Sequence, residues 1–340
     1  MNKYIKYDLI SIVIPVYNAG KYISKFAESI FNQTYPNVEF VFVEDCSPDN
    51  TWQMLQELKS THKDKNIILY RNEHNLGAGA TRNKGLELAS GKYVYFADAD
   101  DELDSNLLQK AYDKLEADQS DFVYIAYKHI IDNKTYFNPI YEPALHAKSI
   151  EQIKNYAQSL FSSPWSKIIR SSFLHENSIY FPNTRSGEDY CWSLHMVLCA
   201  QKISFINEYL YTYIQTSNSL STGYDSALCI FKNLDYANCL LAQMKGPTYL
   251  KKRFYDGFIS AYCTYCKNLS YEDRISLINE FKKKNHPQLV KQRLQEFSLW
   301  ERKPFYRIIP KFLHSAKRKL LKERYNIYKT YQYALSTVDQ

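Results

Sequence analysis

Glycine and proline are scarce in this sequence of 340 residues, which contains 9 and 11 of them. So few of either exclude a collagen-like chain and a chain dominated by flexible linkers. No apolar run approaches the roughly 20 residues that a membrane-spanning helix needs. Residues 1–8 are charged and lack the apolar core of a signal peptide, so we expect a chain that is not exported.

A regular cysteine pattern is also missing, because the seven cysteines are odd in number and irregular in spacing. Such cysteines are typical of reduced thiols, which predicts a cytoplasmic protein. Cys263 and Cys266 form a C-x-x-C pair within a helical pattern, without further ligands at the spacing of a zinc site. We interpret both as core residues.

What the sequence does contain is apolar and aromatic: 45% of its residues are hydrophobic and 31 are tyrosine. The hydrophobic content predicts a folded core, and the number of tyrosines indicates surfaces that stack on ring-shaped ligands. The last 40 residues hold ten Lys or Arg and three acids, which accounts for the whole formal charge of +7. The rest of the chain is electrically balanced, so we expect no nucleic-acid partner.

Short apolar runs alternate with helical patterns over the first third of the chain. The runs cover residues 11–16, 38–44, 67–70, 93–97 and 122–126, and the helical patterns cover 21–32, 52–59, 81–89 and 107–117. This alternation predicts an α/β fold with a mostly parallel sheet flanked by helices. Ligands of such folds gather at the carboxyl ends of the strands. We interpret residues 77–79 as a flexible loop.

Four carboxylates follow the apolar run that ends at residue 97: Asp98, Asp100, Asp101 and Glu102. Like charges this close repel and raise one another's pKa values. A divalent cation would offset the repulsion, and Asp98 and Asp100 can aim at one point from a turn. The alternative is a solvated helix start, since acids suit a helix N-terminus and residues 102–117 have a helical pattern. Asp101 is then the candidate cap.

Four ordered segments carry a family resemblance: residues 11–18 (SIVIPVYN), 43–51 (VEDCSPDNT), 72–83 (NEHNLGAGATRN) and 96–101 (FADADD). Together they resemble the family 2 inverting glycosyltransferases of the GT-A fold, densely over about residues 10–105 and sparsely to about 222. The resemblance implies a catalytic domain over residues 1–222, with a nucleotide-sugar half to about 127 and an acceptor half from about 128. A helical region (223–300) and a basic amphipathic tail (301–340) would form a C-terminal extension.

In that family a nucleotide sugar, here expected to be a UDP-sugar, lies across the strand ends. Pro15 and Tyr17 match the loop that packs on the uracil and ribose, although Tyr17 could instead pack in the core. Asp45 matches the acid that accepts a hydrogen bond from the uracil N–H. Arg82 matches the Ala-Arg-Asn segment, with Thr81 in place of the usual alanine. Arg82 could pair with a phosphate or with the base, or bridge to the acid cluster.

The resemblance also supplies a metal site and a base. Asp98-Ala-Asp100 matches the D-x-D signature that binds Mn2+ or Mg2+ and the diphosphate, so that charge is neutralised as UDP leaves. Glu188 and Asp189 match a Glu-Asp motif whose Asp removes the proton of the acceptor hydroxyl. Asp189 is thus the predicted base, with Glu188 as the second choice, and inversion requires the base opposite the leaving group. An acidic N-cap pair is the alternative.

Residues 164–167 resemble a Trp-x-Lys element of the same family. Trp165 could form an apolar platform under a sugar ring, and Lys167 could hold a phosphate. A core tryptophan and a surface lysine are the alternative. The Q-x-x-R-W signature of processive synthases is absent, so we expect one sugar to be added per encounter.

In the tail, apolar residues recur at intervals of three and four from Phe312 to Leu321, with bases between and opposite them. This pattern predicts an amphipathic helix on an anionic membrane surface. Since such enzymes often extend lipid-linked glycans, we expect a peripheral protein on the inner face of the plasma membrane. A helix docked on the catalytic domain is the alternative.

The sequence therefore predicts metal-dependent, inverting transfer of one hexose or N-acetylhexosamine from a UDP-sugar. The acceptor would be a hydroxyl of a growing lipooligosaccharide, capsule or O-antigen glycan, free or lipid-linked. A nucleotidyltransferase acting on sugar phosphates is an alternative, but it would want a basic Gly-rich loop where residues 17–20 read Tyr-Asn-Ala-Gly. A non-catalytic sugar-binding module is another, although it would tolerate loss of acids that are all present.

Overall fold

A computed structural model describes residues 7–156, 160, 162–184 and 186–215, with isolated residues at 229, 233, 236, 237, 239, 240, 272 and 276. The chain divides into two compact units, one of residues 1–219 with 235–254 and the other of residues 220–234 with 255–340. The fold below belongs to the first unit. The predicted basic tail, and the predicted helical region apart from those isolated positions, lie outside the described residues.

Strands and helices alternate through the first half, as predicted. In chain order it holds β1 (Ile10–Val16), α1 (Ile23–Phe31), β2 (Val38–Glu44), α2 (Thr51–Thr61), β3 (Asn66–Arg71), α3 (Ala78–Leu88), β4 (Tyr93–Phe96), β5 (Glu102–Leu103) and α4 (Leu107–Asp118). The second half holds β6 (Phe122–Ile131), β7 (Lys134–Asn138), α5 (Glu142–Leu145), α6 (Ile150–Asn155), a 3₁₀ turn (Pro164–Ser166), β8 (Lys167–Arg170), α7 (Ser171–Glu176), α8 (Glu188–Cys199) and β9 (Ile203–Ile214).

The strands form one sheet in the order β3-β2-β1-β4-β8-β6-β9-β5, with β7 paired to β6. Strands β1 to β4 are parallel to their neighbours in this group, whereas β8 runs antiparallel to both β4 and β6. The predicted α/β fold of the GT-A kind is confirmed: β1 to β4 of the nucleotide half are parallel, and β6 and β9 form a further parallel pair. Parallel strands end at the same edge, so this half gathers its loops there.

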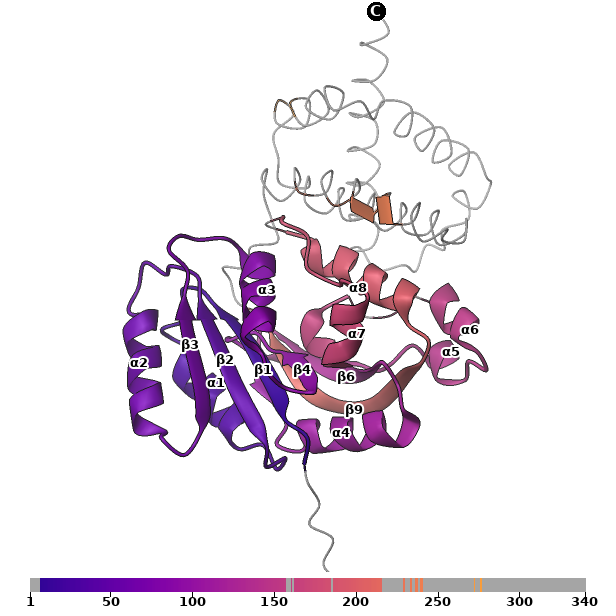
Figure 1. Cartoon of the computed structure of the whole chain (residues 1–340), viewed down its shortest axis with the longest axis horizontal. Helices are drawn as coiled ribbons and strands as arrows, with labels where there is room; N and C mark the ends of the chain where they lie inside the picture. The colour runs from indigo at the N-terminus through magenta and orange to yellow at the C-terminus, as the bar shows by residue number, and fades with distance from the viewer. Residues whose placement is uncertain are drawn as a thin grey trace, which may run out of the picture. The chain divides into compact units, whose positions relative to one another are not determined.

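Helices cover both faces of the sheet (Figure 1). Side chains of α1 and α4 pack with Ile12 and Ile14 of β1 in one core layer. Side chains of α3, α7 and α8 pack with Val13 in the other. Alternate residues of β1 thus point to two buried faces, which explains why the strand reads as a continuous apolar run.

Three local expectations are corrected by the structure, one of them by a pairing distant in sequence. Residues 77–79 are not a flexible loop, because α3 begins at Ala78. Glu102 does not begin a helix, because Glu102 and Leu103 pair with β9, and α4 begins only at Leu107. After residue 130, beyond the predicted alternation of strands and helices, β6 and β7 form a hairpin. Its turn residues Asp132 and Asn133 have φ of 48° and 59°. Short polar side chains tolerate this left-handed conformation.

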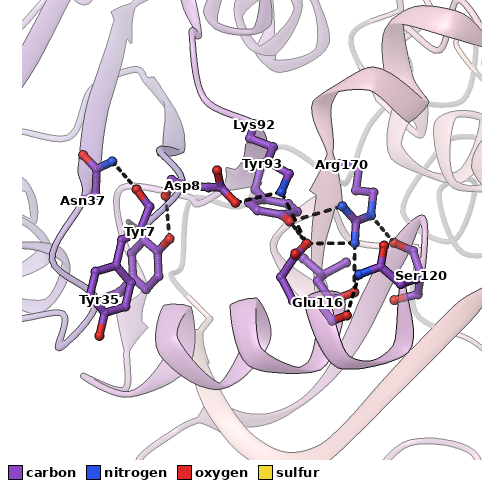
Figure 2. A network of polar contacts seen from close by, with 11 residues as sticks. Tyr7, Asp8, Tyr35, Asn37, Lys92, Tyr93, Glu116, Ser120 and Arg170 are labelled. Carbon is purple, nitrogen blue, oxygen red and sulfur yellow. Dashed lines mark hydrogen bonds and ion pairs between the residues drawn. The ribbon is translucent and has the colours of Figure 1, made fainter. Parts of the chain in front are cut away.

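The amino-terminal edge of the sheet holds a closed polar network, which Figure 2 shows. Lys92 Nζ lies 2.7 Å from Asp8 Oδ2, and Arg170 Nη2 lies 3.0 Å from Glu116 Oε1. Arg170 also donates to the carbonyl of Ser120 at 2.7 Å. Two bases thus meet two acids at this edge. In the part of the chain described above, no helix is long and apolar enough to cross a membrane.

Candidate active site

The carboxyl ends of β1 and β2 carry the first predicted site residues. Pro15 lies within β1 beside Val43 of β2, and Tyr17 follows the strand with 44% of its surface exposed. The alternative of a core-packed Tyr17 is therefore wrong, and the ring is free to stack on a ligand. The loop is held in place because Asn18 N–H donates to Ser47 Oγ at 2.9 Å.

Asp45 is buried at the end of β2 and organises the neighbouring loop. Its Oδ1 accepts hydrogen bonds from Asn72 Nδ2 and from the Leu76 N–H, both at 2.8 Å. Its Oδ2 accepts from the Gly77 N–H at 2.8 Å. A carboxylate has about four lone-pair sites, so one remains for a further donor such as a uracil N–H. The predicted role of Asp45 is compatible with this geometry, and the loop-building role is an addition to it.

Arg82 joins the two halves of the domain. Its Nη2 donates to Asp98 Oδ1 at 2.8 Å, and its Nη1 donates to Glu188 Oε1 at 3.2 Å. Of the three partners considered for Arg82, the structure has the bridge to the acid cluster. Burial opposes its charge, but Asp98 and Glu188 outweigh burial and raise the pKa of Arg82 above its usual value. The guanidinium is thus a fixed positive charge between two carboxylates.

The acid cluster after β4 has two parts with different roles. Asp100 is partly exposed, and burial together with Asp98 raises its pKa to about 6. Asp101 is buried and accepts hydrogen bonds from Tyr211 Oη at 2.6 Å and from the Ile214 N–H at 2.7 Å. The expectation that Asp101 caps a helix is therefore wrong. It ties the acid loop to the end of β9 instead.

Asp98 and Asp100 have the donor set of a shared metal site. Within the described ranges there is no group of three or more His, Cys, Asp and Glu side chains that could enclose a metal ion. Mg2+ is commonly held by one or two carboxylates, with substrate phosphates and waters completing the shell. Asp98 keeps one oxygen beyond its bond to Arg82, and Asp100 hydrogen bonds to no side chain among the described residues. The pair fits a cation that also binds a diphosphate.

Glu188 and Asp189 begin α8, directly after Gly187 with its φ of 74°. Burial and Asp189 raise the pKa of Glu188 to about 7, against the opposing effect of Arg82. Burial also raises the pKa of Asp189, again opposed by Arg82. One oxygen of Asp189 accepts from the Tyr190 N–H at 2.7 Å, as an acid at a helix end would. The other oxygen accepts no hydrogen bond from the described residues, and a pKa nearer neutrality suits a general base.

One face of α3 holds the segment that leads into α8, which the sequence interpretation missed. Asn83 Nδ2 donates to the Phe181 carbonyl and Asn83 Oδ1 accepts from the Phe181 N–H, both at 2.9 Å. A Cβ on Gly79 would lie 2.9 Å from Glu188 Cγ, so only glycine admits this approach. Gly79, Arg82 and Asn83 lie three and four residues apart, which is the spacing of one helix face. That spacing in the sequence could have indicated that these three residues act together on one face of α3.

Trp165 lies in the core rather than on a ligand surface. It is 5% exposed, and its ring stacks on Tyr211 at 4.5 Å and on Tyr213 at 5.7 Å between centroids. The core interpretation of Trp165 therefore has the support of the structure. Its effect on the site is indirect, through Tyr211 and the hydrogen bond of that residue to Asp101.

Lys167 is fully buried, so the surface alternative for it is wrong. Its Nζ donates to the Ser163 carbonyl at 2.9 Å and lies 4.8 Å from the centroid of the Tyr124 ring. Burial lowers the pKa of Lys167 well below its usual value, against the opposing effect of Asp189. The structure does not bring this ammonium group to the strand-end surface where Tyr17 and Asp100 lie.

Solved structures of glycosyltransferases share this fold. The S. aureus TarS fragment 1–349 superimposes with a TM-score of 0.63 at 23% identity, over 96% of this chain and 92% of that one. The mannosyltransferase PcManGT from Pyrobaculum calidifontis, solved with GDP-Man and Mn2+, gives a TM-score of 0.56 at 14% identity, over 97% of this chain and 88% of that one. At these identities the likeness shows the fold alone.

Sequence comparison goes further. Glycosyltransferase GlyG of Streptococcus pneumoniae serotype 4 is 30% identical over 223 residues, which are 63% of this chain and 73% of GlyG. Poly(ribitol-phosphate) beta-N-acetylglucosaminyltransferase TarS of Staphylococcus aureus is 30% identical over 206 residues, which are 60% of this chain and 35% of TarS. The family model of glycosyl transferase family 2 matches residues 11–177. The strand-end acids, the Arg82 bridge and these matches agree: the chain is a glycosyltransferase and belongs to glycosyl transferase family 2.

Proposed function

We propose that this enzyme transfers one hexose or N-acetylhexosamine from a UDP-sugar to a hydroxyl of a bacterial surface glycan, with inversion at the anomeric carbon. Family membership sets aside the nucleotidyltransferase and the non-catalytic module. Relatives named for poly(ribitol-phosphate) and teichuronic acid support a cell-surface glycan acceptor. The TarS structures with UDP-GlcNAc and UDP support a UDP-sugar donor.

The observation that carries the proposal is the Arg82 bridge. It holds Asp98 of the nucleotide half and Glu188 of the acceptor half at the two ends of one guanidinium. Inverting transfer needs a leaving diphosphate on one face of the sugar and a base on the opposite face. A bridge between the D-x-D acid and the Glu-Asp pair supports such a two-sided site.

In this proposal the chain binds and orients the donor first. Tyr17 stacks on the uracil, and the remaining lone pair of Asp45 accepts the uracil N–H. Asp98 and Asp100 would hold Mn2+ or Mg2+, and the bound cation would neutralise charge on the diphosphate. Asp189 takes the proton of the acceptor hydroxyl as the hydroxyl oxygen attacks the anomeric carbon, and the bond between that carbon and UDP breaks. Glu188 and Arg82 keep α8 in register with the donor side.

The test is UDP release from UDP-glucose, UDP-galactose, UDP-GlcNAc and UDP-GalNAc, with Mn2+ and with a chelator. We expect release from at least one donor, and a rate that falls in chelator. The GDP-mannose reaction is the control, because it offers the same diphosphate with another base and another sugar. Turnover of GDP-mannose alone would refute the UDP assignment, and full activity in chelator would refute the metal.

We also propose that the reaction takes place at the inner face of the plasma membrane, with residues 301–340 on its anionic surface. The support is the concentration of bases in that segment. Each base near such a surface contributes about 1 kcal/mol, so replacing Lys317, Arg318 and Lys319 by Gln should weaken binding about a hundredfold. Co-sedimentation of the full chain with phosphatidylglycerol vesicles measures this. Equal binding to neutral phosphatidylcholine vesicles would refute it.

A further inference from the structure

Among the described residues, exposed large apolar side chains gather at two separate places, with Tyr180 apart from both. One set surrounds the carboxyl ends of β1 to β3 and belongs to the proposed donor site: Tyr17, Tyr22, Tyr70 and Leu76. The other comprises Phe137 on β7 and Tyr141 just beyond it, with exposures of 58% and 40%. Tyr136 precedes Phe137 on the same strand, so its side chain points to the opposite face of the hairpin and is not part of this set. Exposed apolar clusters mark binding surfaces, and the proposed reaction leaves the second set without a use.

A pocket opens beside this second set. It has a volume of about 540 Å³ and lies between residues 139–146 and Asn207 of β9. Its polar side chains are Glu142, His146 and Asn207. Figure 1 shows α5, which lies within this segment, beyond β6 on the side away from β3. The pocket is therefore separate from the strand ends that carry Tyr17 and Asp45.

Asn207 offers a fixed hydrogen-bond donor to this pocket. Its Oδ1 accepts from the Ile140 N–H at 2.8 Å, and this bond sets which way the amide points. Asn207 is exposed, and its Nδ2 hydrogen bonds to nothing else in the described part of the chain. A donor held in position by a backbone bond loses little freedom when a ligand binds.

The aromatic rings are held as well. Phe137 packs against Tyr209 with 5.0 Å between ring centroids, and Tyr141 packs against Tyr156 at 5.4 Å. Both contacts are edge-on, so a face of each exposed ring stays open. Exposed rings of fixed orientation next to planar polar side chains match a ligand with an apolar face and a hydroxyl rim.

That description fits a saccharide. Its ring carbons present C–H groups to an aromatic face, and its hydroxyl groups exchange hydrogen bonds with amide, imidazole and carboxylate side chains. The large exposed apolar residues of this surface are all aromatic, whereas a lipid or protein partner would also favour aliphatic side chains. Among the described residues that line the pocket there is one acid and no lysine or arginine, which favours an uncharged chain over an anionic one.

We propose that Phe137, Tyr141, His146 and Asn207, together called the β7 surface, bind a neutral saccharide chain outside the catalytic site. The identification of this chain as the distal part of the acceptor rests on the proposed function, whereas the binding itself does not. An enzyme that adds one sugar per encounter to a long glycan would gain acceptor affinity from a second contact.

The test is calorimetric titration of the full chain with cellohexaose, chitohexaose and β-1,3-galactohexaose. We expect at least one of them to bind. Tyr141→Ala removes a stacking ring and should weaken that binding about tenfold, whereas Tyr141→Phe should not. Asn207→Asp keeps the acceptor for the Ile140 N–H but removes the free donor, and should weaken binding about fivefold. Tyr180→Ala, an equally exposed tyrosine elsewhere, is the control.

Several outcomes overturn the proposal. Binding of none of the three hexasaccharides does so, and so does equal binding by wild type, Tyr141→Ala and Asn207→Asp. Loss of a dimer in Phe137→Ser by light scattering, without any saccharide effect, would assign the β7 surface to a second copy of this chain. UDP release separates the two proposals: Tyr141→Ala should retain it, and saccharide binding without UDP release would refute only the proposed reaction.

Discussion

The two edges of the parallel strands use charge in opposite ways. At the amino-terminal edge, Asp8 meets Lys92 and Glu116 meets Arg170. At the carboxyl-terminal edge, Arg82 pairs with both Asp98 and Glu188, and four more acids lie beside them in the chain: Asp100, Asp101, Glu102 and Asp189. The Tyr93 hydroxyl, Lys92 and Arg170 lower the pKa of Glu116, whereas burial and Asp98 raise that of Asp100 to about 6.

This contrast separates stability from function. Paired charges at the amino-terminal edge favour the folded state. Excess acids at the other edge cost folding free energy, and such groups are kept where a ligand or a proton is to be bound. Substitutions at the amino-terminal edge should therefore change stability, and substitutions at the carboxyl-terminal edge should change activity.

The largest effect is expected at the proposed base. Asp189→Asn removes the proton acceptor and should lower kcat by about 10² to 10⁴. The melting temperature should stay the same or rise, because a buried carboxylate among other acids is lost. UDP release and a thermal melt measure the two quantities. Asp64→Asn, at an exposed position, is the control and should change neither. Retained activity in Asp189→Asn would refute the assignment.

The next effect is expected at the proposed metal ligands. Asp98→Asn and Asp100→Asn should each lower kcat by about 10² to 10³, and raise the Mn2+ concentration needed for half-maximal activity. Asp101→Asn is informative beside them, because Asp101 bonds to Tyr211 and to β9. It should lower the melting temperature without a specific change in the Mn2+ response. The same Mn2+ response in all three variants would contradict the division of roles within the acid cluster.

A smaller loss is expected from the clamp on Phe181. Asn83→Ala breaks two hydrogen bonds that hold the segment before α8, so kcat should fall about tenfold with an unchanged donor KM. Because Asn83 positions the base and does not titrate, the pH profile of kcat should keep its shape. Asn83→Asp keeps the bond from the Phe181 N–H and should recover part of the rate. A raised donor KM instead would place Asn83 in donor binding.

At the amino-terminal edge, stability should change and chemistry should not. Arg170→Met removes an ion pair and a hydrogen bond to the Ser120 carbonyl from a partly buried site. The free energy of unfolding should fall by about 2 kcal/mol. Urea denaturation measures this, and UDP release per folded molecule should equal that of the wild type. A drop in kcat would show that the two edges are coupled.

The smallest effect is a pH dependence. Because the pKa of Glu116 in the folded chain lies below its ordinary 4.5, the carboxylate stabilises the fold above that pH. Its contribution is lost as the pH falls through the lowered value. The difference in unfolding free energy between wild type and Glu116→Gln should thus be constant near neutral pH and shrink below about pH 4.5. A difference that grows in acid would reverse the sign.

The strands and site residues that could be predicted from the sequence are those marked by short local patterns. Apolar runs predicted β1 to β4, and the polar residues directly after them predicted which side chains meet at the carboxyl-terminal edge. Asp45 and Asp98 are placed there by the strands alone, because parallel strands end together. The family resemblance added Asp189, whose position far along the chain no local pattern connects to β4.

What could not be predicted depends on contacts between distant segments. β5 exists only because Glu102 and Leu103 pair with β9, more than a hundred residues away. Lys167 resembles a surface residue until β8 inserts between β4 and β6. The buried roles of Asp101 and Trp165 follow from their contacts with Tyr211 of β9, which lies far from both in the sequence.

Gly79 has a consequence for how finely the site is adjusted. An added methyl group there would lie 2.9 Å from Glu188 Cγ and 3.3 Å from Phe181 Cβ, so the start of α8 would have to retreat. Rates of transfer fall steeply when reacting groups are misplaced by a fraction of a bond length. The position of the proposed proton acceptor on α8 thus depends on the absence of a Cβ atom at Gly79 on α3.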